Sequence, residues 1–147
     1  SLVFGAMDPA FAKQINGSGE DFWATGVSLI IHPRNPRVPT VHANFRMIEK
    51  GDQIWFGGGA DLTPYYPYKK DFNHFHNTWK KACDPYNSYE KMKETCDKYF
   101  VNKHRDNEMR GIGGIFFDHL NSGDMEKDFD MVVDLSNHFI ESYKPTS

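Results

Sequence analysis

The clearest pattern of hydrophobic and polar positions runs over residues 40–49. Alternate positions are apolar and the positions between them are polar: Val41, Ala43, Phe45 and Met47 against His42, Asn44 and Arg46. Because successive side chains of a strand point to opposite faces of a sheet, this alternation predicts a β-strand. We expect its apolar face to pack in the core and its polar face to carry chemistry or to meet water.

A second strand is predicted over residues 26–32, which are rich in β-branched and aliphatic side chains. Three prolines, at 33, 36 and 39, exclude a helix or a central strand from the connection that follows. If the two strands pair as an antiparallel hairpin with His32 opposite His42, Ser28 lies opposite Arg46. The polar faces of the two strands then coincide.

The rest of the chain alternates between strands and helices. A third strand at residues 54–56 is expected to end in the glycines at 57–59 and to place Asp61 at a sharp exit. We further expect helices over 9–15, from an N-cap at Asp71, over 88–105 and over 124–143, and a strand over 115–118. This order predicts an α+β fold with a largely antiparallel sheet flanked by helices.

Each of the three longer helices has an apolar face. Helical spacing places an aromatic stripe on the first, with His76 inside the stripe and His74 pointing away: Phe72, Phe75, Trp79 and Cys83. The second is expected to face inward with Met92, Cys96, Tyr99 and Phe100, and His104 follows one turn later. The last is expected to leave His138 exposed and to bury Phe129, Val132, Val133, Ser136, Phe139, Ile140 and Tyr143.

Composition narrows the classes of function. The chain has 147 residues, enough for one domain with its own core, and its net charge of −3 argues against nucleic acid as a partner. No stretch approaches the roughly 18 apolar residues of a membrane span. Aromatic residues make up 15% of the chain, which indicates a thick aromatic core or a pocket for a flat apolar ligand. Cys83 and Cys96 lack the spacing of a zinc site or a disulfide framework, so we expect reduced thiols.

Two groups of side chains suggest chemistry. The first is a set of four histidines that could bind zinc, copper or iron: His32, His42, His76 and His104. Its alternative is that each is a hydrogen-bonded structural residue, as we expect for His74, His119 and His138. The second combines the polar stripe with an acid and suits an anionic substrate that needs proton transfer: His42, Asn44, Arg46 and Asp61. Its alternative is a solvated sheet face with one ion pair.

Five segments carry a resemblance to a known family. They are residues 26–46, 55–64, 71–76, 96–105 and 110–118, and they include the strings VPTVHANFR, WFGGGADLTP and RGIGGIFFD. In order and spacing they resemble the aerobic, oxygen-dependent coproporphyrinogen III oxidases of haem synthesis. Together they cover nearly the whole chain.

The resemblance implies oxidative decarboxylation of two propionate side chains of coproporphyrinogen III to vinyl groups, which gives protoporphyrinogen IX, CO2 and H2O2. Dioxygen is the co-substrate, and no flavin, haem or nicotinamide is expected. Catalytic roles fall on His42 as the proton donor, on Asp61 as the group that holds the pyrrole nitrogens, and on Arg46. Substrate contacts fall on Ser28, Asn44, Phe45 and Arg46. A divalent metal is described in bacterial relatives at positions that fall on His32, His42, His76 and His104.

Family members are about twice as long as this chain. The resemblance therefore implies that residues 1–147 are the central portion of one larger domain, without its N-terminal helix and its C-terminal strands and helices. It also implies a homodimer and a location in the cytoplasm or, alternatively, the mitochondrial intermembrane space. The chain departs from the family at Lys69 and Lys70, at Thr95 and at His119, where acidic residues, Trp and a second Asp are usual. Two alternatives remain open: a non-catalytic module that binds a tetrapyrrole or a metal, and an aromatic-rich structural domain.

Overall fold

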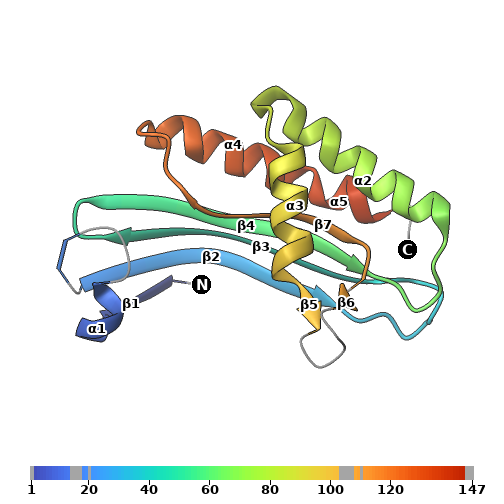
Figure 1. The fold of residues 1–147 in the computed structure, drawn as a ribbon, viewed down its shortest axis with the longest axis horizontal. Coiled ribbons are helices and arrows are strands. Elements are labelled where there is room, and N and C mark those ends of the chain that lie inside the picture. The colour runs from blue at the N-terminus through green and yellow to red at the C-terminus, as the bar shows by residue number, and fades with distance from the viewer. Residues whose placement is uncertain (1, 14–17, 20, 103–107, 110, 145–147) are drawn as a thin grey trace.

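The computed structural model describes residues 2–13, 18–19, 21–102, 108–109 and 111–144. The strands are β1 Leu2–Ala6, β2 Asp21–Ile31, β3 Thr40–Lys50, β4 Gln53–Thr63, β5 Val101–Asn102, β6 Glu108–Met109 and β7 Gly113–Leu120. The helices are α1 Pro9–Ala12, α2 Lys69–Cys83, α3 Tyr89–Tyr99, α4 Met125–Asn137 and α5 Phe139–Tyr143, with a 3-10 turn at Asp84–Tyr86. Five strands form one antiparallel sheet in the order β1-β2-β3-β4-β7, and α2, α4 and α5 lie on one side of it (Figure 1). The predicted α+β class is confirmed.

Strand β3 lies at the centre of the sheet and has the predicted alternation. Val41, Ala43 and Phe45 are buried on the side of the helices, whereas His42, Asn44 and Arg46 are only partly buried. The predicted pairing with β2 is wrong by two residues, because His42 lies opposite Ile30 and Ser28 lies opposite Asn44. Pro33 has no N–H to donate to a ladder, so β2 ends at Ile31 and His32 belongs to the loop. Since the shift is even, the polar faces still coincide.

The helix side of the sheet holds the core. From α2, Phe75, Trp79 and Cys83 are fully buried against the sheet, as predicted, and Phe72 is partly buried. The core cluster also includes residues of β3, β4, β7 and α4, such as Leu62, Ile115 and Leu135. The predicted N-cap at Asp71 is wrong: the helix begins at Lys69 after Tyr68, and Asp71 lies buried in its first turn, where a carboxylate interacts favourably with the helix dipole.

The second predicted helix is shorter than expected. Helix α3 ends at Tyr99, because Phe100 leaves helical geometry with φ −94° and ψ 66°, and the chain continues into β5. Met92 and Cys96 are buried as predicted, but Tyr99 is 64% exposed. The helix was predicted to continue as far as residue 105. This is wrong for residues 100–102, which are not helical, and His104 lies outside the described residues. Helix α3 packs against β7, at the edge of the sheet (Figure 1).

The last predicted helix is divided in two at His138. Asp124 caps α4 by accepting a hydrogen bond from the backbone N–H of Lys127, at 3.1 Å. The inward face is rotated from the predicted one, since Met131, Val132, Leu135 and Phe139 are buried. Of the residues predicted to be buried, three are exposed: Phe129, Val133 and Ile140. His138, predicted to be exposed, is partly buried, and its Nδ1 bonds the Asp134 carbonyl in the preceding turn at 2.8 Å.

Strand β4 continues through the three glycines, so Asp61 lies within the strand and not at an exit from it. Neighbouring backbones explain the absence of side chains here. A Cβ at Gly59 would lie 2.4 Å from the carbonyl oxygen of Ile115 in β7, which is closer than any tolerated contact. The glycine run thus lets β7 pair closely with β4, where the sequence pattern had suggested the end of the strand.

The N-terminal residues form an edge strand of the sheet, which the hydrophobic pattern of the sequence did not predict. Strand β1 pairs with residues 21–25 of β2, and the predicted helix over 9–15 is described only as α1, since residues 14–17 lie outside the described ranges. Beyond Gly26, β2 has no partner strand on this side among the residues that the structure describes. Val27, Ile30 and Ile31 are exposed there.

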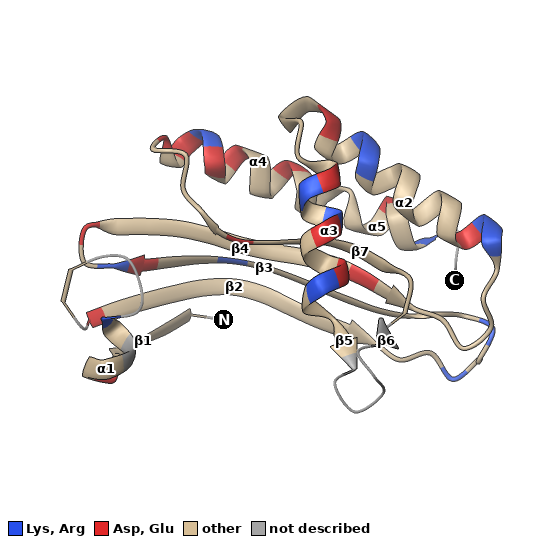
Figure 2. Cartoon of the chain, viewed as in Figure 1, with Lys and Arg blue, Asp and Glu red and all other residues tan. Residues whose placement is uncertain are grey.

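Charged residues are distributed unevenly over these elements. Figure 2 shows them concentrated on the helices, and on β2 the single charged residue is Asp21, at its beginning. Within the described ranges, no helix is both long enough and apolar enough to span a membrane.

The buried thiols give a test of this core. Cys83 and Cys96 are both fully buried, and burial raises the pKa of the Cys83 thiol to about 11. Because the thiolate is the reactive form, we expect both cysteines to react with a thiol reagent at about pH 8 only when the protein unfolds. Labelling in increasing urea should therefore follow the unfolding transition seen by circular dichroism. Rapid labelling of Cys83 in the folded protein would contradict the packing of α2.

Candidate active site

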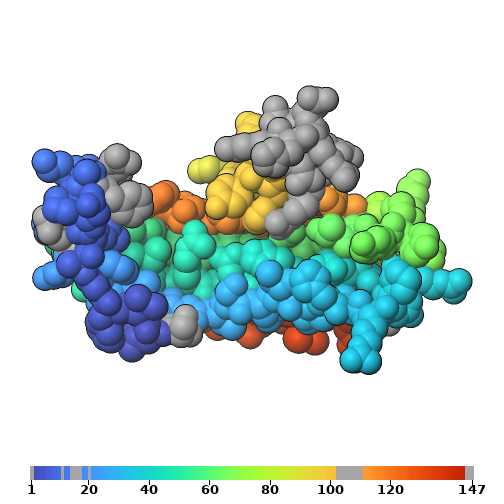
Figure 3. Space-filling view, turned by 90° about the horizontal axis from the view of Figure 1, so that it is seen from below, coloured from blue at the N-terminus to red at the C-terminus, as the bar shows by residue number. Residues whose placement is uncertain are grey.

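The polar side chains of the sheet share the face opposite α2, α4 and α5. Strand pairing and contacts place on it Ser28, His42, Asn44, Arg46, Asp61, Phe116 and Asp118. Figure 3 views this face, with the strands side by side from blue to orange and the end of α3, in yellow, over the β7 side. Four strands thus contribute to one surface. For β3, the alternation had predicted that its three polar residues share a face.

His42 and Asp61 form a pair across two strands. They lie directly opposite each other on β3 and β4, and His42 Nδ1 is 2.9 Å from Asp61 Oδ1. Asp61 is 1% exposed, while the His42 side chain retains 21% of its exposure. Because an ionised carboxylate can only accept, the proton of the ring lies on Nδ1 in this pair, which leaves Nε2 to exchange a proton with a ligand.

Arg46 is held from two sides. Its Nη1 donates to Asn44 Oδ1 at 3.1 Å, and its Nη2 lies 3.2 Å from Asp118 Oδ2 on β7. The Arg46 side chain is 34% exposed, so the guanidinium can still meet a solvent-borne anion. Asp118 was not singled out from the sequence, although it has the same strand parity as Phe116 and follows an apolar run. The sequence alone does not show that β7 pairs with β4, which brings Asp118 to Arg46.

An aromatic group borders His42. The ring of Phe100 meets His42 edge to face at 6.1 Å and Phe116 at 5.7 Å, and Tyr99 stacks on Phe116 at 4.3 Å. Phe75 and Trp79, from the aromatic stripe predicted on α2, lie in the core on the helix side and do not belong to this group. Tyr99 and Phe100 come from the end of α3, which had been predicted to face inward, and Phe116 comes from β7.

Ser28 and Phe45, both predicted to contact the substrate, lie on opposite faces of the sheet. Ser28 is exposed on the polar face and opposite Asn44. The Phe45 side chain points to the other face, where it belongs to the core cluster. Its backbone lies between Val27 of β2 and Gly58 of β4, in the middle of the sheet. The Phe45 side chain therefore does not reach the polar face.

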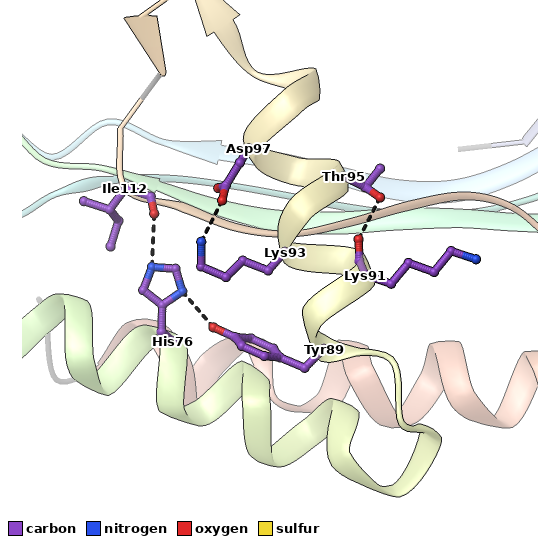
Figure 4. A network of polar contacts seen from close by, with 7 residues as sticks. All are labelled: His76, Tyr89, Lys91, Lys93, Thr95, Asp97 and Ile112. Carbon is purple, nitrogen blue, oxygen red and sulfur yellow. Dashed lines mark hydrogen bonds and ion pairs between the residues drawn. The ribbon is translucent and has the colours of Figure 1, made fainter.

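His76 lies on the helix side and joins three elements, as Figure 4 shows. Its Nε2 is 3.0 Å from the Ile112 carbonyl oxygen, and its Nδ1 is 3.1 Å from the Tyr89 hydroxyl. A carbonyl only accepts, so Nε2 carries the proton and Tyr89 donates to Nδ1. Burial lowers the pKa of His76, which favours this neutral ring, and burial raises the pKa of Tyr89 to about 12, which keeps its hydroxyl protonated.

The described residues do not fit the metal set suggested by the resemblance. Metal binding needs a free lone pair on the imidazole, and the one on His76 is taken by Tyr89. His32 is exposed in the loop after β2, and His104 lies outside the described ranges. Within those ranges no three residues among His, Cys, Asp and Glu are grouped as metal ligands. We derive no step of the chemistry through a metal.

A cavity of about 380 Å³ lies between α3 and β7. Residues of both elements line it, among them Met92, Thr95, Phe117 and His119. His42, Asn44, Arg46 and Asp61 are not part of its lining, but Phe116 and Asp118 are. The cavity therefore adjoins the candidate site, which is the polar face itself.

Comparison with known proteins agrees with this arrangement. The family model described as coproporphyrinogen III oxidase matches residues 1–147. This chain belongs to the coproporphyrinogen III oxidase family. The oxygen-dependent coproporphyrinogen-III oxidase of Francisella tularensis subsp. novicida (strain U112) is 50% identical over 154 aligned positions, which cover 99% of this chain and 50% of the relative.

A second relative supports the same family. The oxygen-dependent coproporphyrinogen-III oxidase of Coxiella burnetii (strain Dugway 5J108-111) is 49% identical over 154 positions, covering 99% of this chain and 49% of the relative. The chain thus spans about half the length of the curated coproporphyrinogen III oxidases that it matches.

The environment of His76 predicts how stability depends on pH. Because the folded state lowers the pKa of His76, the unfolded chain binds this proton more readily, and stability is lost as the pH falls below the unfolded value of about 6.5. We expect the free energy of unfolding of wild type to fall more between about pH 7.5 and pH 5 than that of His76→Gln. Urea titrations at both pH values measure this difference. An equal fall in both proteins would show that His76 is not held neutral.

Proposed function

We propose that this chain carries the substrate-binding face of an oxygen-dependent coproporphyrinogen III oxidase. The observation that carries the proposal is the His42–Asp61 pair, joined at 2.9 Å beside an anchored and half-open Arg46, in a chain matched over its whole length by the family. One face thus presents a proton carrier, a cation and aromatic rings. A tetrapyrrole with propionate side chains requires these three kinds of group.

The proposed reaction converts two propionates to vinyl groups. For each propionic acid side chain, the bond to the carboxyl carbon breaks and CO2 leaves, a hydrogen is lost from the carbon next to the pyrrole, and a carbon–carbon double bond forms. The substrate gives up two electrons, and O2 accepts them with two protons to become H2O2. Dioxygen is the only co-substrate that this balance requires.

His42 and Asp61 are proposed to handle protons. Nδ1 of His42 is fixed by Asp61, so Nε2 is the atom placed to donate a proton to, or take one from, the bound macrocycle. Asp61 is proposed to hold the pyrrole nitrogens and to balance charge on a deprotonated pyrrole. Because Asp61 is almost completely buried, its carboxylate acts in a region of low dielectric, where charges interact more strongly.

The propionates are proposed to bind the other polar residues of the face. Arg46 offers a planar guanidinium that suits a carboxylate, and Asn44 and Ser28 add hydrogen-bonding groups from the same face. The edge of Phe100 and the stacked pair of Tyr99 and Phe116 support an apolar macrocycle beside His42.

The complete protein is proposed to be larger than this chain. We infer that residues 1–147 form the central portion of one coproporphyrinogen oxidase domain, since the relatives are about twice as long. The family resemblance supports a homodimer. The bacterial origin of the relatives supports the cytoplasm over the mitochondrial intermembrane space.

Replacement of His42 tests the function. In the complete protein, His42→Gln should lower turnover of coproporphyrinogen III under air by about 100-fold or more, because the general acid or base is lost. Chromatography of the porphyrin products, after oxidation, measures the vinyl groups formed. The matched control is His138→Gln, since the His138 side chain is 23% exposed, close to the 21% of His42, but contacts Asp134 of the preceding helical turn and lies on the helix side.

The same assay separates the alternatives. Anaerobic titration with the porphyrinogen, followed by admission of oxygen, should show saturable binding and then vinyl product. Binding without product in wild type would indicate a non-catalytic tetrapyrrole-binding module. Normal turnover in His42→Gln would remove the role proposed for His42.

A further inference from the structure

We propose that Asp118 is a positioning residue, which holds the guanidinium of Arg46 in the orientation that a substrate carboxylate requires, and that Gly57 and a bulge in β7 exist to allow this contact. The proposal rests on the proposed function, because it concerns how that site recognises propionates. It assigns roles to Asp118, His119 and Gly57 that neither the sequence pattern nor the family resemblance supplied.

The first step is the bulge. Strand β4 pairs Gly58 with Phe117 but Phe56 with Leu120, so Asp118 and His119 together lie opposite Gly57. His119 takes φ 55°, the left-handed region that a residue with a side chain seldom adopts. In a regular strand two successive side chains point to opposite faces. Here both meet groups of the polar face, since Asp118 contacts Arg46 and the His119 ring stacks on Trp55 at 6.0 Å.

The second step is that Asp118 is itself fixed. Its Oδ1 accepts a hydrogen bond from the backbone N–H of His119 at 2.9 Å, which leaves Oδ2 to contact Arg46 at 3.2 Å. The backbone N–H that fixes Oδ1 belongs to the residue in left-handed geometry. The bulge therefore determines where the acceptor for Arg46 lies.

The third step is the space that Gly57 leaves. A Cβ at this position would lie 2.9 Å from Arg46 Nε and 2.9 Å from Asp118 Oδ1. Both contacts are shorter than real Cβ contacts, so any side chain at 57 would displace the two partners. Gly57 has no positive φ, and the requirement here is for room alone.

Together these contacts select one geometry for Arg46. Asn44 and Asp118 engage two of the five N–H groups that a guanidinium offers, and the others remain to meet a carboxylate in a fixed plane. An arginine that is already oriented loses less conformational freedom when the anion binds. Asp118 thus improves binding of an anion although its own charge repels that anion.

The negative charge of Asp118 and its orientation of Arg46 have opposite effects on anion binding, so removal of Asp118 changes KM in opposite directions under the two explanations. In the complete protein, Asp118→Ala should raise KM for coproporphyrinogen III and lower kcat/KM by roughly 10-fold to 100-fold, as misplacement of a binding group does. Asp118→Asn keeps an acceptor oxygen for Arg46. Its KM and kcat/KM should therefore lie between those of Asp118→Ala and those of wild type. If Asp118 were only a neighbouring negative charge, its removal would lower KM, and that result would overturn the proposal.

A double-mutant cycle shows whether Asp118 acts through Arg46. Asp118→Ala should have little further effect on kcat/KM when introduced into Arg46→Ala, because the group that it orients is gone. Equal effects in the two backgrounds would overturn the proposal. Gly57→Ala, which displaces the same pair, should reproduce the rise in KM and should likewise lose its effect in Arg46→Ala.

Two controls keep this test separate from folding and from the proposed function. Asp84→Ala removes an exposed ion pair of similar length, Lys80 with Asp84 at 3.1 Å, and should leave KM and kcat unchanged. Thermal unfolding of Asp118→Ala and Asp118→Asn should stay near that of wild type, since Asp118 is 35% exposed. Absence of turnover in wild type would remove the proposed function, whereas normal wild-type turnover with an unchanged KM in Asp118→Ala would overturn the positioning role alone.

Discussion

The two-residue period of β3 is the constraint on which the remaining arrangement depends. This strand is paired on both sides from Val41 to Lys50, so its side chains cannot rotate from one face to the other without breaking two ladders. Burial of Val41, Ala43 and Phe45 under the helices therefore holds His42, Asn44 and Arg46 on the opposite face. The apolar core and the polar site are two consequences of one alternation.

Strand β4 adds a second constraint, because its glycines at 57–59 have no side chains to separate the neighbouring strands. At Gly59 the neighbouring backbone of β7 approaches so closely that no side chain fits, and at Gly57 the space is used by the Arg46–Asp118 pair. Asp61 is the polar residue that projects from β4 beside His42. Because residues 57–59 carry no side chain, this part of β4 lets groups of β3 and β7 come into direct contact.

The sequence predicts the parts of the fold that follow from local periodicity. The alternation in β3 and the stripe of Phe75, Trp79 and Cys83 were found because each depends only on neighbours along the chain. The exact pairing with β2, the end of α3 at Tyr99 and the inward face of α4 were missed, since they depend on how elements pack. For the same reason His42 and Asp61 were recognised as candidates, while Asp118 became visible only through the pairing of β7 with β4.

The histidines illustrate how residue type alone misleads. His42 and His76 were grouped as ligands of one metal, yet one lies on the polar face beside Asp61 and the other on the helix side between Tyr89 and Ile112. Their partners determine their chemistry: a carboxylate leaves one ring nitrogen of His42 open, and a hydroxyl with a carbonyl occupies both nitrogens of His76. Such differences arise from tertiary contacts that spacing along the chain does not encode.

The outer edge of β2 has a consequence for how this chain behaves in solution. From residue 27 to residue 31 it carries no charge and no proline, and Val27, Ile30 and Ile31 are exposed beside backbone groups that no described strand pairs. Natural sheets usually protect such an edge with charges, proline or a covering segment. Without a cover, this stretch favours edge-to-edge recruitment of further strands, so solubility and aggregation at high concentration depend on it.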